Sequence, residues 1–204
     1  MSIETMERPQ TATVNVPANI LVDLLSGGLV AAGKDKSLPI LAAVYLTATN
    51  GRIEIAATDR YRLIVGSAPC ELLDSFEAII PRDDVERIIR LCKEYAKSRT
   101  VNYSAIISKM GDVLTVTVLA DTATIPLLTG KFPPFKHLFG GEPKDVGEIA
   151  LDPRLLGEFA KVPGMGKGVP MRLTFQGSNK SVILGLSHDA ITWQALLMPM
   201  RFPN

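Results

Sequence analysis

The sequence has few cysteines and no long apolar run, and both absences narrow the class of protein. Only two cysteines, Cys70 and Cys92, occur among 204 residues, which fits neither a disulfide framework nor a zinc site. We expect reduced thiols, with Cys92 on an apolar helix face. No apolar run reaches the roughly 18 residues that a membrane span needs, and the N-terminus lacks the basic and apolar regions of a signal peptide. The chain is therefore expected to be cytoplasmic, without membrane contact.

An excess of charge of either sign is also lacking. The chain has 22 lysine and arginine residues against 21 aspartate and glutamate residues. Net charge alone therefore indicates neither a nucleic acid nor a membrane as partner, and any basic surface has to come from local segregation. The 47% hydrophobic content is enough for a sizeable core in one or two domains.

Residue patterns typical of catalysis are missing as well. The two histidines have no cysteine or carboxylate at metal-ligand spacing, and no serine lies in a nucleophile-elbow motif. The glycine-rich segment 28–34 ends in Lys34, but Asp35 follows where a phosphate-binding loop requires serine or threonine. We expect no catalytic residue, no metal and no cofactor, so that an enzyme is the minority hypothesis.

One order of elements recurs along the chain: a strand, a helix and then a hairpin. Alternating apolar residues predict the strands, and apolar residues three and four apart predict the helices. The Asn50-Gly51 pair between two alternating runs is a strong hairpin signal. The predicted first strands are 11–16, 78–80 and 148–151, the helices follow Pro17, Pro81 and Asp152, and the later strands are 40–49, 52–57, 100–107, 113–119, 171–175, 181–186 and 192–197. Three such copies predict an α+β fold of repeated strand-helix-antiparallel-strand units.

The repeat also sets the expected domain boundaries. Residues 1–10 have little to bury and are expected to be a mobile tail. Two units fill residues 11–139, a linker rich in proline and glycine covers 140–147, and the third unit fills 148–204 as half a domain. A polar linker would not be aromatic, so the rings just before it are expected to pack on the fold: Phe132, Phe135 and Phe139.

Two stretches far apart in the sequence are expected to meet. Residues 57–63, Ala-Thr-Asp-Arg-Tyr-Arg-Leu, leave a strand through a Thr-Asp turn and place an aromatic ring between two arginines. Residues 196–201, Leu-Leu-Met-Pro-Met-Arg, form an apolar run interrupted by a proline. Together they predict an apolar pocket with a polar lip, a shape suited to binding a short peptide.

Basic side chains concentrate near the predicted helices. On the second helix they lie opposite the apolar stripe or on its flank. Taken alone, this pattern favours an ordinary solvated face, with Glu86 and Glu94 beside the basic residues, and both explanations stay open. If such helices face one way, they can follow a phosphate backbone without reading bases. The candidate DNA-facing residues are Arg87, Arg90, Lys93, Lys97, Lys34, Lys36, Arg154 and Lys161.

Four short motifs follow one another in a family order. They are Leu38-Pro39-Ile40-Leu41, Thr58-Asp59-Arg60-Tyr61-Arg62-Leu63, Gly130-Lys131-Phe132-Pro133 and Met198-Pro199-Met200-Arg201. In this order they resemble the bacterial sliding clamp, the beta subunit of DNA polymerase III. The resemblance covers about residues 11–202: residues 11–139 resemble the family's middle domain and residues 148–204 its C-terminal end.

The resemblance implies a DNA-clamp fold and a DNA polymerase processivity factor. In that family, helices line a ring around duplex DNA, which is bound without regard to sequence. Linear peptides of the replicative polymerase, the clamp loader and repair proteins dock between the middle and last domains. Carried over by motif, the peptide-binding pocket consists of Leu41, Thr58, Arg60, Tyr61, Arg62, Leu63, Pro133, His137, Leu138, Leu196, Leu197, Met198, Pro199 and Met200.

The chain departs from the family pattern in two respects. Family members carry twice as many units as the three predicted here, so a ring would need about four chains, and we expect a homo-oligomer. Arg60 replaces the small residue common in the family's turn, which is expected to narrow the pocket. The alternative function is a non-encircling adaptor or decoy that sequesters clamp-binding proteins.

Overall fold

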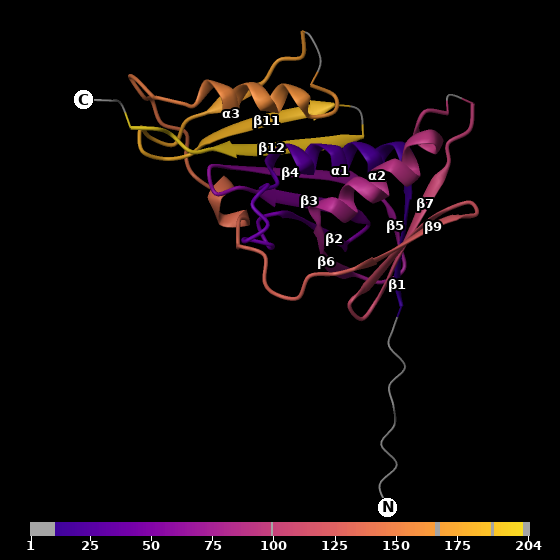
Figure 1. Cartoon of the computed structure of the whole chain (residues 1–204). Helices are drawn as coiled ribbons and strands as arrows, with labels where there is room; N and C mark the ends of the chain where they lie inside the picture. The colour runs from indigo at the N-terminus through magenta and orange to yellow at the C-terminus, as the bar shows by residue number, and fades with distance from the viewer. Residues whose placement is uncertain (1–10, 99, 166–167, 189, 202–204) are drawn as a thin grey trace, which may run out of the picture.

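Two helices lie side by side at the centre of the molecule, between two antiparallel sheets (Figure 1). The computed structural model describes residues 11–98, 100–165, 168–188 and 190–201. The predicted tail at 1–10 lies outside the described residues. The elements fall into three successive segments, 12–69, 76–126 and 150–201, each with a helix near its start and several strands after it. These segments are called the first, second and third units below.

The first unit has one helix and four long strands. They are β1 (Ala12–Pro17), α1 (Ala18–Ala31), β2 (Ala43–Thr49), β3 (Arg52–Thr58) and β4 (Arg62–Pro69). The short β5 (Glu71–Leu72) leads to the second unit, which consists of β6 (Phe76–Pro81), α2 (Arg82–Ala96), β7 (Ser104–Met110), β8 (Val113–Val118) and β9 (Asp121–Pro126). The third unit, preceded by η1 (Lys136–Phe139), consists of α3 (Pro153–Glu158), η2 (Phe159–Lys161), β10 (Arg172–Thr174), β11 (Val182–His188) and β12 (Ile191–Leu197).

The two long helices begin in the same way but bury different amounts of surface. Pro17 and Pro81 are the N-cap residues, and their fixed φ of −55° and −54° turns an extended strand into a helix. Helix α2 is amphipathic and buries Val85, Ile88 and Cys92. Helix α1 carries a single charged residue, Asp23, and is apolar on most of its surface. An apolar helix of this kind needs cover on several sides, and α1 receives it from α2, β3 and β4.

The strand order joins all three units. One sheet has five strands in the order β5-β1-β7-β8-β9, and the other has seven in the order β10-β11-β12-β4-β3-β2-β6. The first and second units exchange strands, because β1 pairs with β7 and β2 pairs with β6. The third unit joins the larger sheet through the antiparallel pairing of β12 with β4. Residues 140–147 carry neither helix nor strand, as expected of a linker. The larger sheet nevertheless continues into the third unit, so the division into two domains stays a prediction.

Three strands were absent from the sequence prediction: β4, β9 and the two-residue β5. Strand β4 contains the continuous apolar run 63–65, which is buried on both faces, so it lacks the alternation that marks a half-buried strand. Strand β9 buries only Ala123 and Ile125 between exposed polar residues. Their absence matters for the fold, because β4 is the strand that receives the third unit.

Four predicted boundaries were wrong, and one of them is that of the strand predicted at 100–107, which is β7 at Ser104–Met110. Residues 40–42 form a turn in which Leu41 N and Ala42 N donate to Leu38 O, so β2 starts only at Ala43. The helix predicted at 153–161 changes to a 3-10 turn at Phe159. The strand predicted at 148–151 is reduced to one isolated bridge between Ala150 and Met200.

A single tryptophan holds the third unit against the first. Trp193 on β12 is 1% exposed, and its ring lies against Gly27 of α1 and Gly66 of β4. A Cβ at either glycine would overlap the ring. The two positions are therefore glycines for a packing reason, and the indole fills the space between helix and sheet.

A second, smaller cluster covers the outer face of the larger sheet. Phe135 is 7% exposed and packs with Leu63, Val65 and Leu196. Its neighbour Phe132 stacks on Tyr45, with the ring centroids 5.0 Å apart, and Phe139 packs against the same cluster. The expectation that these phenylalanines pack on the fold is confirmed, and they hold the segment before the linker on the sheet.

Both cysteines are free thiols. Cys92 is buried on the apolar face of α2, as predicted, and burial raises the pKa of its thiol to about 11. Among the described residues, three or more metal-ligating side chains nowhere gather into a possible metal site. Within the same residues, every helix is too short or too polar to cross a membrane.

Candidate functional site

The junction between β4 and β12 brings together the two stretches singled out in the sequence. Leu196 lies opposite Leu63, and Leu197 lies opposite Arg62. Beyond the ladder, Met198 N donates to Tyr61 O at 2.9 Å. Residues 57–63 and 196–201 are therefore neighbours along the edge of the junction, held by main-chain hydrogen bonds.

The turn between β3 and β4 is held by its own polar side chains. Asp59 Oδ1 accepts from Tyr61 N and from Arg62 N, each at 3.0 Å. Thr58 Oγ1 donates to Arg62 O at 2.7 Å. Asp and Thr favour such turns because their short side chains reach the backbone two or three residues ahead. The result is a fixed loop that presents Arg60 and Tyr61 to solvent, with Tyr61 60% exposed.

Arg60 adopts a backbone conformation that suits glycine better, with φ of +80°. Left-handed backbone costs a non-glycine residue about 1–2 kcal/mol, while glycine loses roughly 0.5–1 kcal/mol in chain entropy. We therefore expect Arg60→Gly to raise the free energy of unfolding by about 0.5–1 kcal/mol. Urea denaturation measures the change. Arg60→Ala, which keeps the Cβ, serves as control and is expected to give no gain in the free energy of unfolding. An equal gain in both variants would contradict backbone strain at this position.

The predicted pocket residues divide by exposure. The buried ones are Arg62, Leu63, Leu196 and Leu197. The half-buried ones are Leu41, Thr58 and Pro199, and the exposed ones are Arg60, Tyr61, Pro133, His137, Leu138, Met198 and Met200. The exposed members therefore form the surface that a ligand can touch, while the buried members hold that surface in shape.

Two further segments reach the junction to different extents. The segment that carries Pro133, His137 and Leu138 is held there by Phe135, which packs on Leu63 and Leu196. Leu41, by contrast, is tied to the end of α1, since its carbonyl accepts from Gly33 N at 2.8 Å.

Arg62 is buried but has two acidic partners. Its Nε lies 3.1 Å from Asp59 Oδ2. Its Nη1 lies 3.1 Å from Glu158 Oε2, an ion-pair distance without hydrogen-bond geometry, so Nη1 has no hydrogen-bond acceptor among the described residues. Sequence analysis missed Glu158, because no local pattern marks a contact between α3 and the turn before β4.

The candidate DNA-facing residues are all exposed, but many are already paired with acidic side chains. Lys36 pairs with Asp83 at 2.7 Å and Lys97 with Glu94 at 2.8 Å. The other paired residues are Arg87 with Asp84, Arg154 with Asp152 and Lys161 with Glu158. Within the described residues, no salt bridge involves Arg90, Lys93 or Lys34, although Lys93 interacts electrostatically with Glu94.

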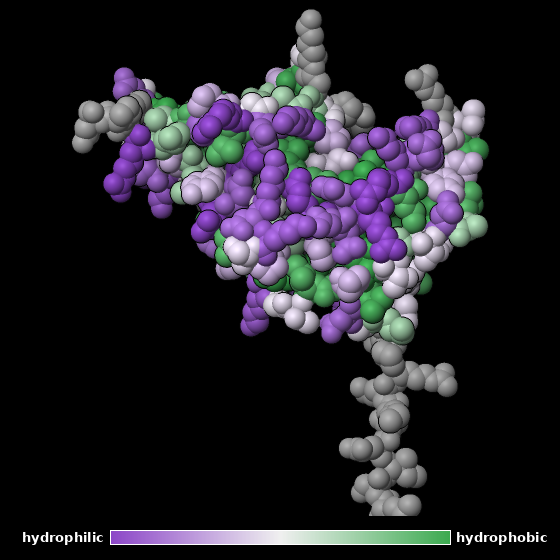
Figure 2. Space-filling view, in the orientation of Figure 1, coloured by the Kyte–Doolittle hydropathy of each residue, from purple (hydrophilic) through white to green (hydrophobic). Residues whose placement is uncertain are grey.

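The charge of the helix face is balanced. Helix α2 contains four basic and four acidic residues, and α1 contains no basic residue. Figure 2 shows hydrophilic side chains gathered in a band across the middle of this face, with apolar patches beside it. Any phosphate contact therefore depends on individual cations such as Arg90 and Lys93 and not on a strong overall field.

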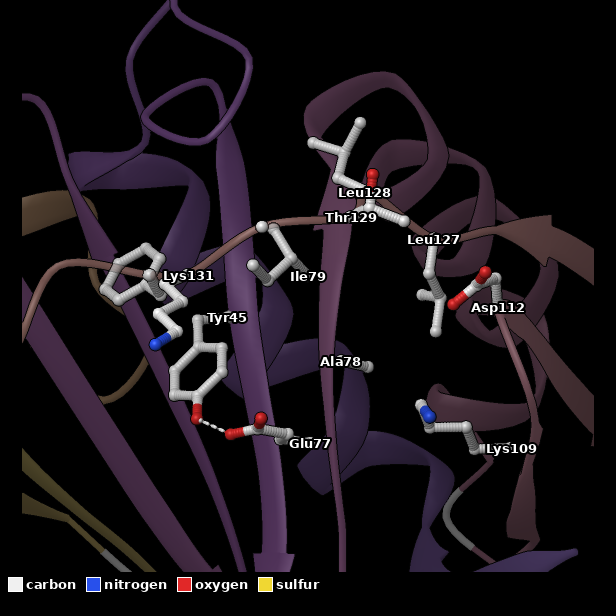
Figure 3. A pocket seen from close by; sticks show the side chains of 12 residues that line it. Tyr45, Glu77, Ala78, Ile79, Lys109, Asp112, Leu127, Leu128, Thr129 and Lys131 are labelled. Atoms are coloured by element: carbon white, nitrogen blue, oxygen red, sulfur yellow. Dashed lines mark hydrogen bonds between the residues drawn. The ribbon is translucent and has the colours of Figure 1, made fainter.

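A hollow elsewhere is lined by none of the predicted peptide-binding or DNA-facing residues (Figure 3). It measures about 460 Å³ and lies between β6 and the β7–β8 hairpin, beneath residues 127–132. On one side the hydroxyl of Tyr45 bonds to the carboxylate of Glu77, and Lys109 and Asp112 stand opposite. Burial, and then the hydrogen bond to Glu77, raise the pKa of Tyr45 above its usual range. The phenol donates to Glu77, and the mixed charges of the lining select no single ligand.

Comparison with known proteins agrees with this architecture. Residues 10–134 match the family described as DNA polymerase III beta subunit, central domain. The beta sliding clamp of Streptomyces coelicolor is 26% identical over 187 residues, which cover 88% of this chain and 48% of that protein.

Solved structures with the same fold come from two further bacteria. The DNA polymerase III beta subunit of Thermotoga maritima superposes with a TM-score of 0.78 at 12% identity, covering 100% of this chain and 68% of that one. The DNA polymerase III subunit beta of Pseudomonas aeruginosa gives a TM-score of 0.75 at 17% identity, covering 98% of this chain and 69% of that one.

The repeated helices, the antiparallel sheets and these superpositions define a protein with the sliding-clamp fold, as the sequence predicted. The chain belongs to the DNA polymerase III beta subunit family. This is a family of non-enzymatic processivity factors. The chain spans about half the length of the curated sliding clamp that it matches.

Proposed function

We propose that this chain is a sliding-clamp-like processivity factor, which binds or encircles duplex DNA and docks peptide motifs of its partners. The partners are a replicative polymerase, a clamp loader and repair proteins, and the chain acts in the cytoplasm as a homo-oligomer. Family membership supports the class. The observation that carries the docking role is the β4–β12 junction, at which the exposed Tyr61, Met198 and Met200 lie close to the same edge.

The chemistry of this edge suits a short peptide with apolar side chains. Met198 and Met200 are 47% and 55% exposed, and Leu138 is 41% exposed. Methionine side chains adapt to differently shaped apolar groups. The strands beneath are fixed by main-chain pairing, so little ordering is needed on binding. Arg60 adds a cation at the rim, which favours a peptide with an acidic residue beside its apolar ones.

The test uses two measurements on the full chain. A fluorescein-labelled peptide with adjacent leucine and phenylalanine and one neighbouring acid is titrated by fluorescence anisotropy. Static light scattering gives the mass in solution with and without duplex DNA. We expect saturable peptide binding and a mass of several chains. A chain that stays monomeric at micromolar concentration would refute the self-assembled ring, and absence of peptide binding would refute the docking role.

Charge reversal at Arg90 and Lys93 tests the DNA contact. Both lie on the exposed face of α2 and form no salt bridge among the described residues, so each is able to neutralise one phosphate. We expect Arg90→Glu with Lys93→Glu to weaken duplex binding and to reduce the slope of log affinity against log salt by about two. Lys131→Glu with Lys180→Glu changes net charge equally on exposed turns away from α2, and is expected to have a much smaller effect.

The balanced charge of α2 favours one alternative. A helix with as many acids as bases attracts DNA weakly. A non-encircling adaptor or decoy needs only the peptide-docking edge and sequesters clamp-binding proteins. Under that alternative the peptide binds as above, while duplex binding is negligible at physiological salt and unchanged by reversal of Arg90 and Lys93.

A further inference from the structure

We propose that Glu158, which belongs to none of the four sequence motifs, is a positioning residue for the peptide-docking turn at 59–62, and that Lys161 shares the negative charge of its carboxylate with Arg62. The inference rests on the proposed docking function. It concerns how residues of α3 and η2 affect the affinity of the docking turn for a peptide.

The contacts form one continuous path. Lys161 Nζ lies 3.2 Å from Glu158 Oε1, and Glu158 Oε2 lies 3.1 Å from Arg62 Nη1. Arg62 Nε lies 3.1 Å from Asp59 Oδ2. The other oxygen of Asp59 holds the backbone N–H groups of Tyr61 and Arg62. The path therefore begins at an exposed cation of the third unit and ends at the turn that presents Tyr61.

Arg62 makes this path sensitive to Glu158. Its side chain is 8% exposed, so its positive charge depends on acidic neighbours and not on water. With Glu158 neutral, only Asp59 remains as a charged partner, and Asp59 is also the residue that holds the turn. The turn already contains Arg60 in a strained backbone conformation. It becomes less ordered when Asp59 has to balance the whole charge of Arg62 as well as hold the turn backbone. A less ordered turn binds a peptide more weakly, because binding then has to order it.

Lys161 and Arg62 contact different oxygens of Glu158, so Lys161 neutralises part of the carboxylate charge that Arg62 also faces. The side chain of Lys161 is 69% exposed, whereas that of Glu158 is 36% exposed. Lys161 and then Arg62 hold the pKa of Glu158 below its usual range, so the carboxylate is ionised at neutral pH. Neutralising Lys161 therefore leaves more of the carboxylate charge to Arg62 and favours the ordered turn.

A double-mutant cycle on the full chain, with the labelled peptide as probe, tests the path. Glu158→Gln keeps the shape and removes the charge, and we expect about fivefold weaker peptide binding. Lys161→Gln is expected to strengthen peptide binding about twofold, because the exposed pair is weak. In the Glu158→Gln background, Lys161→Gln is expected to have no effect.

Arg154→Gln is the matched control, since Arg154 lies on the same helix and pairs with its own Asp152. It is expected to leave peptide affinity unchanged. If Glu158 had only a structural role, Glu158→Gln would lower the melting temperature, but Lys161→Gln would change peptide affinity equally with and without Glu158. The inference is overturned if Glu158→Gln binds like the unaltered chain, or if the effects of the two substitutions add. If the unaltered chain does not bind the peptide, both the proposed function and this inference fail. That result differs from the two outcomes above, in which the unaltered chain binds the peptide and only the inference is overturned.

Discussion

Replacement of Trp193 by alanine is expected to lower the free energy of unfolding by about 3–5 kcal/mol, the usual range for loss of a buried aromatic side chain. The indole is 1% exposed and lies between Gly27 and Gly66. Neither glycine has a side chain that can move into the space. The cavity would therefore persist, and it would lie at the contact between the third unit and the first.

Far-UV circular dichroism in urea is the appropriate measurement, because the substitution removes the only tryptophan. Gln194→Ala is the control, since Gln194 is the next residue on β12 and is exposed. It is expected to change stability by less than about 0.5 kcal/mol. A loss below about 1 kcal/mol for Trp193→Ala would show that the third unit is held by other contacts. An additional early transition would indicate that this unit unfolds by itself.

Tyr61→Ala combined with Met200→Ala is expected to weaken peptide binding about a hundredfold or more, within the range found for central interface residues. The two side chains are 60% and 55% exposed, so their removal takes away contact surface and leaves the core intact. Leu63 is less suitable, because it is 4% exposed and its truncation would disturb the cluster around Phe135. Fluorescence anisotropy gives the affinity, and the melting temperature shows that the fold is unchanged.

Ile106→Ala combined with Met110→Ala provides a matched control. These residues lie on β7 in the other sheet and are 46% and 52% exposed, so the loss of exposed apolar surface is comparable. We expect the control to bind the peptide like the unaltered chain. Equal weakening in both variants would indicate nonspecific apolar binding, and full binding by the Tyr61 and Met200 variant would place the peptide elsewhere.

Much of the local structure was predictable because its causes are local. The Asn50-Gly51 pair produces the β2–β3 hairpin, and both residues adopt positive φ as such a turn requires. The apolar spacing on α2 predicts its buried face correctly. Strand β4 was missed for the opposite reason: it is buried on both faces and shows no alternation.

The candidate site divides in the same way. The sequence motifs point to Tyr61, Met198 and Met200, and the structure places them near one edge because β12 pairs with β4. The partner of Arg62 was not predictable, since Glu158 lies on a short helix of another unit and neither residue carries a local signal for the other. Whether these groups bind a peptide stays a prediction.

The sequence by itself determined the helix positions, most of the strands, the Asn50-Gly51 hairpin and the family, because periodicity, turn residues and short motifs are properties of neighbouring residues. Only the tertiary structure decided that the third unit continues the sheet of the first, that Trp193 lies between two glycines, and that Arg62 reaches Glu158. Each of these depends on complementary shape or charge between residues far apart in the chain. Such complementarity leaves no periodic pattern in the sequence.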